Sequence, residues 1–269
     1  MQPPLLTDRA ALSRNRRRAT AFFLQDMIIG EVEERRKEVN RTFTDPAVVT
    51  AFPHLWPDML SVADDEVLAL APLAHDLVFH ALSLHWANDP VGQLVQCRRA
   101  LKPDGWLLAL MFGGQTLQEL RACLAQAESD VTGGLSPRVL PMGEIRDLGS
   151  LLQRAGFALP VADSFTTIVR YRDIWHLMTD LRAMGEGNAL AARLRRPTGR
   201  AVFERAAELY SNLRGADGLI PATFEIVALS GWAPHDAHQK PLRPGSAVNR
   251  LAQALQTAEL PLPRGQSPR

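Results

Sequence analysis

Glycine is absent from a long stretch near the front of this chain, since none occurs between Gly30 and Gly92. Glycines permit tight turns and a close approach of the backbone to a nucleotide cofactor, because they carry no Cβ atom. No residue within 43–63 replaces them. The usual glycine-rich cofactor turn is therefore excluded from this part of the sequence.

Other scarcities exclude further classes of protein. The two cysteines, Cys97 and Cys123, are too few for a disulfide scaffold and too far apart for a zinc site, which fits a cytoplasmic location. No run of about 18 apolar residues could span a membrane, and Met1–Arg18 lacks the apolar core of a signal peptide. A net charge of only +1 predicts no general preference for nucleic acid or membranes.

Length and pattern favour one main domain with flanking segments. We expect an N-terminal helical segment at 1–42 and an α/β domain at 43–235, with a helical insertion at about 173–214. A C-terminal extension would follow at 236–269, where Lys240 and Arg243 offer charge to a protein partner. Arginines within 14–18 lie either on a solvated helix face or against a partner or lipid headgroups.

The front of the α/β domain is too short for a complete doubly wound fold. Strands are predicted at 48–52 and 60–63, within a segment interrupted by several prolines. Each parallel crossover takes a dozen or more residues, so at least one strand–helix unit is missing here. From residue 76 the pattern is clearer, and the apolar run 77–84 predicts a central parallel strand.

The remaining elements alternate between helices and strands. Asp89-Pro90 predicts a helix start and residues 106–111 the next strand. The other predictions are a helix from a Thr116/Glu119 capping box to about Glu128, a helix ended by Gly156, an antiparallel strand pair at 159–162 and 166–171, helices at 174–181 and 198–213, and a last strand at 222–229.

Several of these segments, taken in order, resemble one known family. They are Ala63–Leu68, Asp76–Val78, Leu82–Asp89, Leu101–Gly105, Gly113–Leu117, Gly133–Pro137, Asp180–Glu186, Ala222–Ile226 and Gly231–His235. Together they resemble the class I S-adenosylmethionine methyltransferases. Within that superfamily the chain is similar to methyltransferase-like assembly factors of respiratory complex I, an arginine hydroxylase family, in a form with a degenerate glycine motif.

The resemblance implies a Rossmann-like sheet with helices on both faces, a shortened N-terminal part and S-adenosylmethionine as cofactor. Asp64 and Asp65 match positions that contact the adenine ring, although an exposed acidic loop is the alternative. Ala81 and Leu82 match the end of the strand where the methionine part of the cofactor passes, and otherwise they are core residues.

The resemblance also points to a substrate site. His85 and Trp86 would line it, although simple packing is the alternative for this tryptophan. Glu186 and Asn188 lie in a glycine-flanked loop that could close over a substrate, while a capping role is the alternative for Asn188. His75, His80 and His85 do not form a two-histidine, one-carboxylate pattern, so no metal site is predicted.

Two functions compete at this point. The first is an S-adenosylmethionine-dependent methyltransferase-like enzyme with an impaired cofactor site, acting on a protein substrate in respiratory complex assembly. The second is a non-catalytic assembly protein that keeps the fold and contacts a protein partner, with room for peripheral membrane contact. A nucleic-acid methyltransferase is disfavoured, because the Asn/Asp-Pro-Pro-Tyr/Phe motif is absent and aromatics make up only 6% of the chain.

Overall fold

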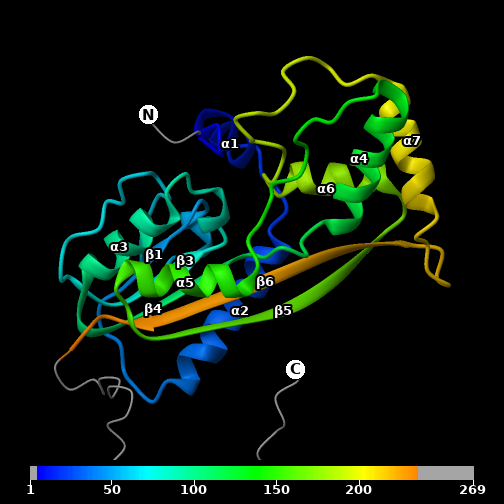
Figure 1. Ribbon diagram of the computed structural model, residues 1–269. Coiled ribbons are helices and arrows are strands. Elements are labelled where there is room, and N and C mark those ends of the chain that lie inside the picture. Colours follow the sequence, from blue (N-terminus) through cyan, green and yellow to red (C-terminus); the bar gives the residue numbers. More distant parts are fainter. Residues whose placement is uncertain (1–4, 236–269) are drawn as a thin grey trace, which may run out of the picture. The chain divides into compact units, whose positions relative to one another are not determined.

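A six-stranded sheet in the order β2-β1-β3-β4-β6-β5 lies at the centre of the computed structural model, which describes residues 5–235 (Figure 1). The expected C-terminal extension, with Lys240 and Arg243, lies outside the described residues. The strands are β1 Pro46–Val49, β2 Leu60–Val62, β3 His75–Ala81, β4 Leu101–Phe112, β5 Ala158–Tyr171 and β6 Ile220–Trp232. Strands β2, β1, β3 and β4 are parallel, whereas β6 is antiparallel to both β4 and β5.

Helices cover both faces of the sheet, because alternate side chains of a strand point to opposite faces. Helices α3 (Pro90–Ala100) and α5 (Ile145–Ala155) bury Leu94 and Leu152 against one face. Helix α2 (Phe23–Glu38) buries Ile28 against the other face, which carries Phe79. The expected Rossmann-like class I methyltransferase sheet with helices on both faces is therefore confirmed.

The shortened front half is also confirmed. Between β1 and β3 the chain contains only strand β2 and the 3-10 helix Pro53–Leu55. Strand β1 nevertheless pairs in parallel with both β2 and β3, so loops replace the usual helical crossovers. The sheet therefore keeps the edge formed by the carboxyl ends of its strands, but it lacks the helical crossover that normally follows its first strand.

A group of three helices lies beside the C-terminal end of β5 and the adjacent start of β6 (Figure 1). It consists of α4 (Gln118–Thr132), α6 (Ile174–Ala183) and α7 (Arg200–Ser211). The buried Tyr210 of α7 ties this group to the sheet, because its hydroxyl donates to the carbonyl oxygen of Pro221 at 2.7 Å. Helix α1 (Arg9–Arg16) is separate from α2, so the N-terminal segment contains two helices.

Two local predictions were wrong. The Thr116/Glu119 capping box does not form, because the Thr116 hydroxyl donates to the carbonyl oxygen of Glu225 and Glu119 accepts from Thr223. Helix α4 begins instead after Leu117, whose φ is 53°. The strand pair at 159–162 and 166–171 is one continuous strand, β5, that pairs with β6 along its length.

The central strand is shorter than predicted and the next one is longer. Strand β3 ends at Ala81 because Leu82 takes a left-handed φ of 41°, and a 3-10 helix, Leu84–Trp86, follows. Strand β4 begins before the predicted residue 106 and includes Asp104, with a φ of 62°. Gly156 ends α5 as predicted, with a φ of 82° that favours glycine.

Helix α2 is expected to be part of the core rather than a detachable arm. Replacing the fully buried Ile28 by Ala should lower the free energy of unfolding by about 2–5 kcal/mol, because it leaves a cavity against the sheet. Urea denaturation followed by circular dichroism measures this change. The matched change Glu34→Ala on the exposed face of α2 should shift it by less than about 0.5 kcal/mol, and equal losses in both variants would contradict this packing.

Candidate functional site

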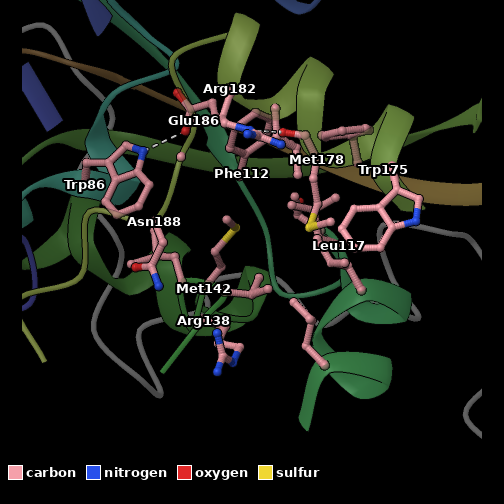
Figure 2. Close-up of a pocket in the computed structure, with 18 of the residues that line it drawn as sticks. Trp86, Phe112, Leu117, Arg138, Met142, Trp175, Met178, Arg182, Glu186 and Asn188 are labelled. Atoms are coloured by element: carbon pink, nitrogen blue, oxygen red, sulfur yellow. Dashed lines mark hydrogen bonds between the residues drawn. The ribbon is translucent and has the colours of Figure 1, made fainter. Parts of the chain in front are cut away.

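Residues predicted to bind a substrate meet beyond the carboxyl end of β3 (Figure 2). His85 and Trp86 lie in the 3-10 helix that follows β3, and Glu186 and Asn188 lie in the loop after α6. The Trp86 indole Nε1 donates to Glu186 Oε2 at 2.7 Å. Gly185 allows this loop to pack, since its φ is 80° and a Cβ there would lie 3.1 Å from the Cα of Arg16.

These residues border a cavity of about 420 Å³. Trp86, Glu186 and Asn188 line it, together with side chains from α4, α6 and α7. Most of the wall is apolar and includes Leu117, Leu120, Leu124, Met142, Met178 and Phe203. A cavity of this size, mainly apolar with a few polar groups in its wall, is the usual form of a ligand site.

Glu186 brings a negative charge to this cavity and is largely shielded, with a side chain 12% exposed. Burial alone would raise the pKa of Glu186, but His85, Arg16 and the Trp86 N–H lower it below its ordinary value. Its Oε2 atom is used by Trp86, whereas Oε1 accepts no hydrogen bond from residues 5–235. The site therefore presents an ionised carboxylate with one oxygen left for a ligand.

His85 lies next to Glu186, outside the cavity wall. Its Nε2 atom lies 3.6 Å from Glu186 Oε2, and its ring packs on that of Phe112 with centroids 4.6 Å apart. The backbone N–H of Phe112 donates to Nδ1 at 3.5 Å. His85 thus contacts the carboxylate and is absent from the cavity wall.

Asn188 borders the same cavity but uses its amide on the backbone. Its Nδ2 donates to the carbonyl oxygen of Pro137 at 2.9 Å, and its Oδ1 accepts from the N–H of Leu190 at 3.0 Å. These bonds hold the loop rather than cap a helix. Its predicted contact with a substrate stays a prediction.

The four residues predicted to bind a cofactor do not gather at this cavity. Ala81 and Leu82 are each only 2% exposed and belong to the core. Asp65 is exposed, with 74% of its side chain accessible, and lies 3.6 Å from Arg9. Asp64 is buried and already paired with arginines from α1.

The ion pair of Asp64 is short and shielded. Arg16 Nη1 lies 2.7 Å from Asp64 Oδ2, and both side chains are only 7% exposed. Arg9 adds a second contact at 3.2 Å. Burial alone would raise the pKa of Asp64, but the charges of Arg16 and Arg9 hold it below its ordinary value of 3.8.

Arg16 corrects the expectation for the arginine cluster. It is neither on a solvated face nor available to a partner, whereas Arg17 and Arg18 are exposed. A signal for this was present in the sequence, because Arg9, Leu12 and Arg16 share one face at helical spacing. The other residues missed were Arg138 and Arg182, which line the cavity.

A second cleft, of about 450 Å³, lies between α1 and the carboxyl ends of β1 and β2. Ligands of open α/β sheets bind at this edge. Its walls include Thr50, Ala51, Arg16, Arg17 and Asp64. The Thr50 hydroxyl accepts the N–H of Phe52 of its own loop, and no glycine opens the backbone there.

These residues do not fit S-adenosylmethionine in the class I manner. The cofactor carries a positive sulfonium centre and ribose hydroxyls that need an acidic acceptor. In this cleft the buried acid, Asp64, already accepts from two guanidinium groups, and a third arginine, Arg17, lines the wall. The negative charge of Asp64 is therefore neutralised by arginines of the protein and is not left for a cationic cofactor.

Two further observations concern the described part of the chain as a whole. Within residues 5–235 no three His, Cys, Asp or Glu side chains come together to hold a metal ion, and His80 is bound to Gln93 at 2.9 Å. None of the helices there has the length and apolarity needed to cross a membrane.

Comparison with known proteins agrees with this fold. The family described as "Methyltransferase domain" matches residues 36–109. "Arginine-hydroxylase NDUFAF5, mitochondrial" of Rattus norvegicus is 43% identical over 195 residues, which cover 71% of this chain and 56% of that protein. "Malonyl-[acyl-carrier protein] O-methyltransferase" of Laribacter hongkongensis is 37% identical over 189 residues, covering 70% of this chain and 61% of that protein.

Among solved structures, a putative methyltransferase from Bacillus halodurans aligns with a TM-score of 0.47 and 13% identity, covering 76% of this chain and 98% of that one. The family model and the curated relatives support a class I methyltransferase-like family for this chain, as the resemblance of its motifs indicated. Its similarity to the arginine-hydroxylase relatives is likewise confirmed. The chain spans about half the length of the curated relatives it matches.

The Asp64–Arg16 pair makes a prediction about stability and pH. Replacing Asp64 by Asn should cost about 3–5 kcal/mol at pH 7, because Arg16 is left buried without its partner. The folded-state pKa of Asp64 is below 3.8, so this contribution is complete above that pH and is lost as pH falls through the folded-state value. The difference in free energy of unfolding between the wild type and Asp64→Asn should therefore become smaller in acid.

Urea denaturation at pH 7 and at pH 3 measures both effects. The control is Asp65→Asn, at the exposed neighbouring residue, which should change the free energy of unfolding by less than about 0.5 kcal/mol. If the difference in free energy of unfolding between the wild type and the Asp64 variant is the same at both pH values, the carboxylate charge is not the source of the stability.

Proposed function

We propose that this chain is a methyltransferase-like protein with an altered cofactor site that binds an arginine-bearing segment of a protein partner during respiratory complex assembly. The names of its relatives support an arginine target, since several are called arginine-hydroxylase NDUFAF5. The cavity bordered by Trp86 and Glu186 is the place where that arginine would bind.

One observation carries this proposal, namely an ionised, largely shielded carboxylate in a cavity with mainly apolar walls. A guanidinium group donates in a planar fork that matches a carboxylate, and Glu186 Oε1 is the acceptor not used within residues 5–235. The Trp86 ring beside it offers a face for a cation. Apolar walls such as Leu117 suit the methylene stem of an arginine side chain.

Methyl transfer from S-adenosylmethionine is the second candidate. The family description and the malonyl-[acyl-carrier protein] O-methyltransferase relatives favour it. The internal pairing of Asp64 with Arg9 and Arg16 argues against ordinary cofactor affinity. The two candidates differ in one measurable respect, which is whether the cofactor binds this chain.

A cytoplasmic location is part of the same proposal. Cys97 and Cys123 are both free thiols, which fits the reducing cytoplasm expected from the sequence. The arginine-hydroxylase relatives are named as mitochondrial proteins. Peripheral membrane contact, which the sequence leaves open, belongs to this proposal as well.

Glu186→Gln tests the arginine site directly. A capped peptide amide with one arginine between apolar residues should bind the wild-type chain and lose at least about tenfold in affinity to this variant, because the carboxylate charge is removed. Isothermal titration calorimetry measures both affinities. The same peptide with glutamine in place of arginine should bind neither protein.

The matched control is Glu208→Gln on the outer face of α7, where the side chain is 68% exposed. This variant should bind the arginine peptide like the wild type. Equal binding by wild type and the Glu186 variant, with both folded by circular dichroism, would contradict the assignment of the cavity to an arginine.

A further inference from the structure

Arg182 brings a second, unmatched charge to the same cavity. It lies in the last turn of α6, is exposed and lines the cavity wall. Its Nε donates to the carbonyl oxygen of Met178 at 2.9 Å, within its own helix. Among residues 5–235 no carboxylate forms an ion pair with it, so the two Nη groups are free for a ligand.

Arg138, the other arginine of the cavity, behaves differently. Its Nε and Nη2 atoms each lie 2.8 Å from the carboxylate of Glu128, and only 13% of its side chain is exposed. Its charge is thus matched within the protein. Of the two arginines, only Arg182 presents a positive charge that an acidic group of a bound molecule would neutralise.

Arg182 and Glu186 lie at one end of the cavity, as Figure 2 shows. They are four residues apart, a spacing that forms ion pairs within a helix. Helix α6 ends at Ala183 and the chain turns at Gly185, so the two side chains form no ion pair with each other. The cavity wall therefore includes one positive and one negative group that form no ion pair with each other.

A ligand with only a guanidinium group would satisfy Glu186 but would meet repulsion from Arg182. A ligand that also carries a carboxylate nearby would satisfy both groups and would be favoured over its neutral counterpart. In a protein segment, this means an arginine with an aspartate or glutamate immediately beside it in the sequence.

We propose that Arg182 is a specificity residue that selects arginines with an adjacent acidic residue. This inference rests on the proposed function, since it describes how the same cavity chooses among arginine-bearing segments. Arg182 would pair with the acidic neighbour while Glu186 holds the guanidinium group.

Three capped peptide amides test the inference by isothermal titration calorimetry. One carries aspartate directly before a central arginine, one carries it directly after, and the third has asparagine at both positions. At least one aspartate peptide should bind the wild-type chain about tenfold or more tightly than the asparagine peptide. In Arg182→Gln this preference should fall below twofold, while the asparagine peptide binds at least as well as before.

The matched control is Arg172→Gln, at an exposed arginine that precedes α6 and is not part of the cavity wall. It should keep the wild-type preference. In higher salt the preference should shrink in the wild type, because screening weakens the contact with an exposed arginine.

The possible failures are distinguishable. If the wild type binds the asparagine and aspartate peptides equally, or if Arg182→Gln keeps the preference, the inference about Arg182 is wrong while the arginine site stands. If none of the arginine peptides binds the folded wild type at millimolar concentration, both the inference and the proposed function are wrong.

Discussion

The buried ion pair between Arg16 and Asp64 is the interaction on which the arrangement of the site depends. Its two side chains meet at 2.7 Å and are almost wholly shielded from water. Such a pair contributes little compared with an apolar pair of the same shape, but the loss of one partner is severe. This contact therefore holds helix α1 at the carboxyl edge of the sheet, because loss of the contact would leave a buried charge without its partner.

The position of α1 determines the walls around it. Its Leu12 packs with Trp86 and Leu190 in a small buried cluster. Asp8, at its N-terminal cap, accepts from Arg193 at 2.9 Å. Helix α1 thus joins the segment after β3 to the loop after α6, which are the two segments that supply Trp86 and Glu186 to the cavity.

The same helix contributes charge to two regions of the molecule. On one side lies the cleft beside β1 and β2, where arginines of α1 neutralise the buried acid. On the other lies the cavity with Glu186, whose pKa is also lowered by the charge of Arg16. One buried arginine thus acts on both carboxylates.

Much of the fold could be predicted from local pattern. The apolar run of β3, the Asp89-Pro90 helix start and the Gly156 helix end each depend on neighbouring residues, and each is observed. The shortened front half followed from the absence of glycine and the small number of residues before β3. Such features need no knowledge of distant partners.

The wrong predictions involve contacts between residues far apart in the sequence. Thr116 and Glu119 have the spacing of a capping box, but β6 supplies Glu225 and Thr223 as competing partners. Asp163 and Ser164 suggest a turn, yet β6 pairs with both and extends the strand. Arg16 was expected on a solvated face or against a partner, because its true partner, Asp64, lies 48 positions away.

The candidate site could be predicted only in part. Trp86, Glu186 and Asn188 were named from a resemblance and do share one cavity, although their contact with a substrate is still a prediction. Arg182 was missed although it lies in the segment Asp180–Glu186, because that segment does not single it out from its neighbours. Its distinction is that it lines the cavity without an ion-pair partner among the described residues, which only a structure can show.

The most direct test of the central claim is a calorimetric titration of the folded chain with S-adenosylmethionine and with S-adenosylhomocysteine. If the Arg16–Asp64 pair has replaced the cofactor's charge partner, neither compound should give measurable heat of binding up to millimolar concentration. Micromolar binding of either compound, weakened by Asp64→Ala, would contradict the claim and would make methyl transfer the leading function.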